Sequence, residues 1–133
     1  MGMLTELVDY LETLGLSLTE GTNIFKGVLP STAIDAGSLV EYDGLGMVKR
    51  QTETGSTLCE MPRLQLMWRS TNYETGMAKI RAIWKALHTV SNTTIGSTFY
   101  QRIESDAPPF HMGKDENGRY LFAVNFTVTR EAS

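Results

Sequence analysis

Apolar side chains near the start of the chain recur with the period of a helix. Three- and four-residue spacing places the leucines and valine of the first turns on one stripe; they are Leu4, Leu7, Val8, Leu11 and Leu14. Glu6, Asp9 and Glu12 fall outside that stripe, and Gly15 follows it as a C-terminal stop. The pattern predicts an amphipathic helix over residues 3–14.

A second helix is predicted from residue 71 to His88. Thr71 and Glu74 have the spacing of a capping box at its start. Its apolar stripe consists of Tyr73, Met77, Ile80, Ile83 (or Trp84) and Leu87. Gly76 interrupts the helix at a cost of about 1 kcal/mol relative to alanine. We therefore expect another element to pack closely against Gly76.

Short apolar stretches bounded by turn residues are typical of strands. Such stretches cover residues 23–28, 38–42, 63–69, 97–104 and 119–129. In the last of them, alternate apolar side chains from Tyr120 to Val128 share one face. Their burial would contribute roughly 8–15 kcal/mol before conformational entropy is subtracted. We expect this strand to lie in the centre of a sheet.

Two stretches lack such periodicity. Residues 45–61 are rich in Gly, Thr, Glu, Gln and Ser, and they predict a long loop. Loops longer than about 15 residues are usually functional or disordered. Residues 105–118 contain Asp106-Ala107-Pro108-Pro109, which breaks regular structure, and a turn from Gly113 to Gly118. We expect both segments to become ordered on assembly.

The order of these elements predicts an α+β fold, a mostly antiparallel β-sheet with two α-helices packed on one face. At 133 residues and 14.8 kDa the chain has the size of one domain with one hydrophobic core, so we expect a single domain over residues 1–133. No apolar run approaches the roughly 18 residues of a membrane span. The first residues also lack the basic and apolar regions of a signal peptide.

Charge and cysteine content argue against several classes of function. The net charge of −3, the pI near 5.3 and the scattered Lys and Arg residues argue against a protein that grips nucleic acid. The single cysteine, Cys59, cannot form an internal disulfide or a thiolate metal cluster. It lacks a histidine nearby in sequence and is more typical of an inert thiol than of a nucleophile.

Candidate chemistry is sparse. His88 near a helix end suits the helix dipole, and His111 has no second ligand nearby for a metal. Asp106, Asp115 and Glu116 share a loop region, where such residues commonly form turns. Gly44-Leu45-Gly46 is a lone GxG without the rest of a dinucleotide motif. We therefore expect no catalytic residue, no metal site and no cofactor.

Three stretches together carry a resemblance to a known family. Residues 62–69 fit a Pro-x-x-Gln-apolar-apolar-apolar-Arg strand, which Tyr73 and the helix ending at His88 follow. Residues 109–120 fit Pro-x-x-x-Gly-x-Asp-x-x-Gly-Arg-aromatic, and residues 125–128 fit a closing Asn-aromatic-x-Val strand. With residues 24–30, these motifs resemble the minor capsid and tail terminator proteins of bacteriophages. Residues 45–61 do not align with the pattern.

The resemblance implies a structural subunit that closes a ring, typically six-fold, at the head-proximal end of a siphophage tail tube. Its partners would be further copies of the chain, the tail tube protein and the head connector or stopper, with DNA passing only as non-specific cargo. The subunit would assemble in the host cytoplasm and reside in the virion. The residues expected at interfaces are Arg63, Gln65, Arg69, Asp115, Arg119 and Asn125.

Other functions remain open from the sequence. Within the same class, the chain could be a head completion or connector-associated minor capsid protein, and loss of the protein would distinguish the two by its effect on tail length. A small ligand-binding module could instead use the polar strip of Arg63, Gln65 and Arg69 to bind an anion. A small enzyme is disfavoured by the missing motifs.

Overall fold

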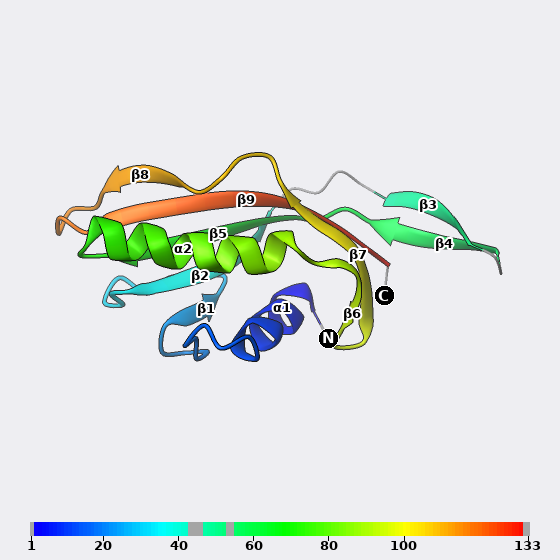
Figure 1. Ribbon diagram of the computed structural model, residues 1–133, viewed down its shortest axis with the longest axis horizontal. Coiled ribbons are helices and arrows are strands. Elements are labelled where there is room, and N and C mark those ends of the chain that lie inside the picture. Colours follow the sequence, from blue (N-terminus) through cyan, green and yellow to red (C-terminus); the bar gives the residue numbers. More distant parts are fainter. Residues whose placement is uncertain (1, 43–46, 53–54, 132–133) are drawn as a thin grey trace.

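The computed structural model describes residues 2–42, 47–52 and 55–131. These residues form two helices and one nine-stranded sheet (Figure 1). In chain order the elements are α1 (Met3–Glu12), β1 (Ile24–Lys26), β2 (Ala36–Tyr42), β3 (Met47–Thr52), β4 (Gly55–Glu60), β5 (Arg63–Ser70), α2 (Tyr73–His88), β6 (Ser91–Ile95), β7 (Thr98–Ser105), β8 (Phe110–Lys114) and β9 (Tyr120–Glu131). Neither helix is long and apolar enough to span a bilayer.

Strand β9 is the centre of the sheet, as its alternation predicts. Phe122 pairs with Trp68 of β5 on one side and with His111 of β8 on the other. Nearer the C-terminal end of β9, β4 pairs with it on the same side as β5, and β7 pairs with it on the same side as β8. Strand β9 therefore pairs with four strands. Beyond β5 the sheet continues to β2 and then to β1, which pairs with β2 in parallel. The other pairs between these strands are antiparallel.

Both helices cover the same face of the sheet (Figure 1). The core between the layers contains buried apolar residues of α1, α2, β5 and β9, among them Leu7, Leu11, Leu64, Leu66, Ile80, Ile83, Phe122, Val124 and Phe126. The alternation of β5 places Leu64, Leu66 and Trp68 in this layer and their neighbours on the opposite face. The predicted α+β fold with both helices on one face is therefore confirmed.

Gly76 lies where α2 approaches the sheet most closely. A Cβ atom at this position would stand 2.5 Å from Cε2 of Phe122 and 2.8 Å from Cβ of Ser70. The close packing expected at Gly76 is therefore present, and it explains why the helix contains a glycine there. The predicted cap of the same helix is wrong by one residue. Asn72 is the N-cap, and its side chain accepts a hydrogen bond from the Thr75 backbone N–H.

The prediction of a loop over residues 45–61 is wrong. Among the described residues of that stretch, β3 and β4 form an antiparallel hairpin. In the part of the chain that the structure describes, β3 pairs with β4 alone, and β4 pairs with β9 only at Cys59↔Glu131 and Glu60↔Arg130. The sequence of this hairpin carries no apolar alternation, so the period-two pattern that predicts a half-buried strand did not indicate it. Residues 45–46 and 53–54, and with them the Gly44-Leu45-Gly46 stretch, lie outside the described residues.

Two further strands were not predicted. Strand β6 contains Asn92, whose positive φ of 46° interrupts the alternation. Strand β8 lies inside the stretch 105–118 that was predicted to be irregular. Its pairing with β9 shifts between His111 and Gly113, and the φ of Gly113 is +116°. Such irregularities hide short strands from a period-two pattern.

The β3–β4 hairpin, called the arm below, extends away from the helices at one end of the molecule (Figure 1). The start of α2, the end of β8 and the turn before β9 lie at the opposite end (Figure 1). The molecule therefore presents two different ends along its longest axis.

Candidate functional site

The six residues predicted at interfaces lie on or beside one surface, the sheet face opposite the helices, which we call the open face. Arg63, Gln65 and Arg69 alternate along β5 with the buried residues of the core. Asn125 pairs with Gln65 in the β5–β9 register, and its side-chain oxygen accepts a hydrogen bond of 3.0 Å from Gln65. Asp115 and Arg119 lie in the turn that leads into β9. The structure thus brings the predicted residues together on or beside the open face.

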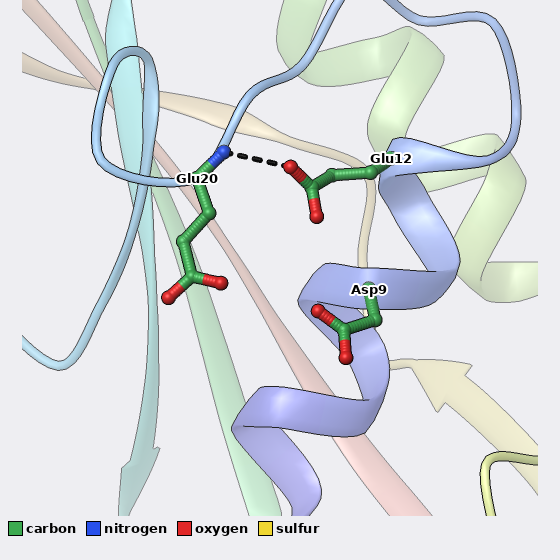
Figure 2. A group of neighbouring side chains, drawn as sticks. All are labelled: Asp9, Glu12 and Glu20. Carbon is green, nitrogen blue, oxygen red and sulfur yellow. Dashed lines mark hydrogen bonds between the residues drawn. The ribbon is translucent and has the colours of Figure 1, made fainter.

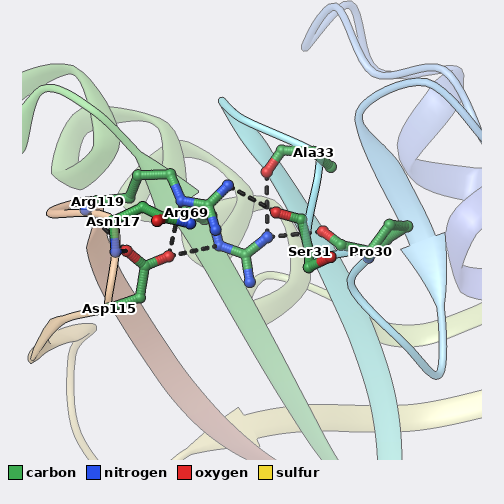
Figure 3. A network of polar contacts seen from close by, with 7 residues as sticks. All are labelled: Pro30, Ser31, Ala33, Arg69, Asp115, Asn117 and Arg119. Atoms are coloured by element: carbon green, nitrogen blue, oxygen red, sulfur yellow. Dashed lines mark hydrogen bonds and ion pairs between the residues drawn. The ribbon is translucent and has the colours of Figure 1, made fainter.

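Two guanidinium groups and one carboxylate form a cluster at one end of the open face (Figure 3). Oδ2 of Asp115 lies 2.7 Å from Nε of Arg119 and 3.5 Å from Nε of Arg69. Oδ1 of the same carboxylate accepts hydrogen bonds of 2.9 Å from the backbone N–H groups of Asn117 and Arg119. The backbone hydrogen bond from Arg119 is the largest cause that lowers the pKa of Asp115.

The same guanidinium groups bind backbone carbonyls of the segment between β1 and β2 (Figure 3). Arg119 donates to the Ser31 carbonyl at 2.7 Å. Arg69 donates to the carbonyls of Pro30 at 2.7 Å and Ala33 at 3.1 Å. Burial, and then the charge of Arg119, lower the pKa of Arg69, but an arginine stays protonated at neutral pH. These donors are engaged within the chain, so the alternative of an anion site on Arg69 loses support.

Arg63 lies further toward the arm. One of its terminal nitrogens is 3.4 Å from Oδ2 of Asp106, whose side chain is 77% exposed. The guanidinium carbon also lies 5.5 Å from the centre of the Tyr42 ring. An exposed ion pair of this kind contributes little to stability. Arg63 can therefore exchange its partner for a group on another molecule at small cost.

A buried carboxylate was missed by the sequence prediction. Glu6, expected outside the apolar stripe of α1, is only 1% exposed. Its oxygens accept hydrogen bonds from the Thr98 hydroxyl at 2.9 Å, the Tyr100 hydroxyl at 2.8 Å and the Ser97 backbone N–H at 3.1 Å. Burial, followed by the hydrogen bond to Glu6, raises the pKa of Tyr100 well above its ordinary value. Glu6 lies three residues after the buried Met3, and this helical spacing was the signal in the sequence that could have predicted its burial.

The base of the arm is fixed to this carboxylate through Arg130 of β9. A terminal nitrogen of Arg130 lies 2.6 Å from Oε1 of Glu60 in β4, and the other lies 3.9 Å from Oε1 of Glu6. The Arg130 side chain is only 11% exposed. An ion pair shielded from water in this way is screened less than a surface pair. It therefore joins the base of the arm to β9 and to the buried Glu6.

Three carboxylates approach one another on the outer side of α1 (Figure 2). Asp9, Glu12 and Glu20 offer oxygen atoms within 4.8 Å of one another, a set that a hard cation could use. All three side chains are exposed, and Glu12 already accepts a hydrogen bond from the Glu20 backbone N–H. The ammonium group of Lys26 lies 3.1 Å from Glu20 and supplies a positive charge from within the chain.

The remaining candidates for chemistry are engaged in structural contacts. Nδ1 of His88 accepts a hydrogen bond of 3.3 Å from the Ser105 backbone N–H. The His111 ring lies against the rings of Tyr73, Tyr120 and Phe122, with centroids 5.2 to 5.6 Å apart. Cys59 is 1% exposed, so its thiol is inaccessible to solvent. Among the described residues, Asp9 and Glu12 of α1 with Glu20 of the following segment form the one group that could supply three metal ligands.

Comparisons with known proteins identify the family. A model of the family described as bacteriophage tail terminator protein matches residues 10–132, which is nearly the whole chain. Among curated protein sequences, none matches the chain significantly. The chain is also similar in fold to a protein in the structure "Virion of native gene transfer agent (GTA) particle". The TM-score is 0.60, with 10% sequence identity over 98% of this chain and 95% of that one. The family match shows that the chain belongs to the bacteriophage tail terminator proteins, which are structural components of the virion.

Proposed function

We propose that this protein closes a ring of identical subunits, six in number, at the head-proximal end of a phage tail tube. There it ends polymerisation of the tail tube protein and joins the tail to the head connector. The observation that carries the proposal is the difference between the two ends of the subunit, because a ring needs two unlike, complementary surfaces on each copy. The arm supplies one of these surfaces (Figure 1).

The strand pairing of the arm supports this proposal. A two-stranded hairpin is at best marginally stable in water without a third strand or a packed layer. Among the described strands, β3 pairs only with β4, and the pairing of β4 with β9 is limited to the base of the arm. The outer edge of β3 is unpaired among the described strands. A neighbouring subunit would cover this unpaired edge of β3.

The open face supports the same proposal. Arg63, Gln65 and Asn125 point away from the helices, and no described helix covers them. We propose that these three side chains contact a neighbouring copy, the tail tube protein or the connector. Arg69, Asp115 and Arg119 act differently, because their donors and acceptors hold the chain's own loops in place. They shape the interface rather than donate to the partner.

The electrostatics agree with a ring that lets DNA pass. A net charge of −3 gives little attraction for phosphates. Two guanidinium groups that might grip a phosphate, those of Arg69 and Arg119, already bind Asp115 and backbone carbonyls. We accordingly propose that DNA is only non-specific cargo and that the protein makes and breaks no covalent bond.

Removal of the arm tests the proposal. In a variant in which residues 47–58 are replaced by a short Gly-Ser turn, we expect a folded subunit that fails to form rings. Phage assembly with this variant should give tails of excessive length, because nothing stops the tube. Native mass spectrometry measures the ring, and electron microscopy measures the tails. Tails of normal length that fail to join heads would indicate a head completion role instead, and normal infectious particles would contradict both.

A further inference from the structure

The outer edge of β8 is open. Strand β8 pairs with β9 on one side, and no other described strand pairs with it. Every second residue of such an edge strand points its backbone N–H and C=O groups away from the sheet. The pairing with β9 shifts between His111 and Gly113, which increases the twist of the edge without closing it. The edge of β8 is therefore a surface on which a strand of another molecule can add.

The side chains of β8 are unusual for a free edge. Phe110 is 44% exposed and Met112 is 48% exposed. Free sheet edges usually carry charged side chains that oppose pairing, whereas large apolar side chains that remain exposed mark contact surfaces. Phe110 pairs with Ala123, which pairs with Met67 of the open face, so Phe110 lies at the margin of that face. A strand added to β8 would cover these side chains and extend the open face.

Three further strands have an open edge among the described strands, and they differ in length and regularity. Strand β1 has three residues, β6 has five and β3 has six. The positive φ of Asn92 interrupts β6. Strand β1 is so short that it can form only a few backbone hydrogen bonds with a partner. The longest of these open edges is that of β3, which pairs with β4 alone in the described part of the chain.

The topology places β3 and β8 on opposite edges of the sheet. Strands β4 and β5 pair with β9 on one side, whereas β7 and β8 pair with it on the other. Because β3 lies beyond β4, a subunit cannot pair its own β3 with its own β8. The two strands also lie at opposite ends of the longest axis (Figure 1). Only a second copy, shifted along that axis, brings the edge of β3 beside the edge of β8.

The directions of the two strands favour the same contact. Strands β4 and β8 both run antiparallel to β9, and β3 runs antiparallel to β4. Strand β3 therefore has the direction of β9, which is opposite to that of β8. Copies that differ by one step of a six-fold ring keep the general sense of their strands. Strand β3 of one copy would thus meet β8 of the next in an antiparallel arrangement, which is the commoner and slightly more stable type of ladder.

We propose that β3 of one copy adds to β8 of the next copy as an antiparallel strand, so that the sheet continues from subunit to subunit around the ring. This inference rests on the proposed ring, and it names the strand that receives the arm, which the ring alone does not specify. Backbone hydrogen bonds between the two strands hold the contact, and the cover over Phe110 and Met112 adds apolar burial. Both open edges are closed by the same contact.

Cross-linking between copies tests the contact directly. Each variant carries one cysteine in β8, at Phe110 or Met112, and one in β3, at Lys49 or Gln51. Because the two cysteines lie on opposite edges of one subunit, a short bismaleimide can join them only between copies. We expect a ladder of cross-linked multimers, and none from chains that carry one of the two cysteines alone. Cys59 is buried, so the unsubstituted protein should not react.

The pattern of cross-links reports the direction of the strands. In an antiparallel contact, moving the cysteine of β8 from Phe110 to Met112 should move the preferred partner toward the N-terminus of β3. A move toward the C-terminus of β3 would overturn the antiparallel arrangement. The control combines Phe110→Cys with Lys26→Cys in β1, the other open edge on the β5 side of the sheet, and it should give no multimers.

Charged side chains on the edge give a second readout. We expect Phe110→Lys with Met112→Lys to weaken ring formation about tenfold, which corresponds to roughly 1.4 kcal/mol, because lysine on an edge strand opposes the addition of another strand. The matched control is Ser91→Lys with Thr94→Lys, a change of equal charge at two exposed positions of edge strand β6, and it should have no effect. Chemical denaturation should show that the free subunit keeps its stability in both variants.

The outcomes separate the two proposals. If the unsubstituted protein forms no ring in solution or in particles, the proposed function fails. If rings form but β8 gives no cross-link to β3 and the lysines on β8 have no effect, only the assignment of the receiving strand is overturned. A cross-link from β8 to β1 of a second copy, or within assembled tails to the tube or connector protein, would likewise overturn it.

Discussion

The sheet beneath the helices and the arm are built from the same antiparallel ladder, but they differ in what lies behind it. In the body, β5 and β9 bury Leu64, Trp68 and Phe122 against two helices. In the arm, β3 and β4 pair with each other, and among the described strands β4 pairs with β9 at two register positions. The comparison suggests that one region is stabilised by folding and the other by assembly. Substitutions in the two regions should therefore affect different measurements.

The largest effect is expected from Phe126→Ala in the body. Phe126 is 1% exposed and lies in the core between the layers, so its removal should lower the free energy of unfolding by roughly 3–5 kcal/mol. Chemical denaturation of the free subunit measures this loss. Gln51→Ala in the arm is the comparison and should change the stability of the subunit by less than about 0.5 kcal/mol. Similar losses from both substitutions would mean that the arm is part of the folded core.

An intermediate effect is expected where the two regions join. Arg130→Met removes the ion pair with Glu60 and the nearby charge at the buried Glu6, at a cost of roughly 1–3 kcal/mol. Hydrogen exchange of the backbone amides in β4 should become faster, because the arm loses its fixed direction. Arg102→Met is the control, since Arg102 forms an exposed pair with Glu104 and should contribute little. Unchanged exchange in β4 would show that Arg130 does not hold the arm.

The smallest effect is expected at Asp115, at the end of the molecule away from the arm. The lowered pKa of Asp115 means that its carboxylate stabilises the fold above the ordinary pKa of about 3.9. This stabilisation is lost as the pH falls through the lower pKa of the folded state. In Asp115→Asn, we therefore expect the melting temperature to be slightly lower at neutral pH and to fall less between pH 5 and pH 2 than in the unsubstituted protein. Parallel melting curves over that range would contradict the assignment.

The sequence predicted the elements that face the core and missed those that do not. Residues 63–69 and 119–129 alternate because one face of each strand is buried, and the structure confirms both. The strands of the arm show no such alternation in their sequence, so residues 45–61 were wrongly predicted to form a loop. Strands β6 and β8 were missed for a local reason, the positive φ angles at Asn92 and Gly113.

The candidate site was predictable in part. The polar strip of Arg63, Gln65 and Arg69 follows from period-two alternation alone. The bridge from Arg69 through Asp115 to Arg119 does not, because residues 69 and 115 meet only when β5, β8 and β9 lie side by side. The burial of Glu6 depends on partners 91 to 94 residues away in the chain. Contacts at such separations leave no local pattern.

The central strand has a consequence for biosynthesis. Strand β9 follows β4, β5, β7 and β8 in the chain, although it pairs with all four. Strands β5, β7 and β8 must remain without this partner on the ribosome until β9 has been translated, and pairing over long separations in the sequence is slow. A nascent chain that ends before β9 therefore lacks the strand that joins both halves of the sheet.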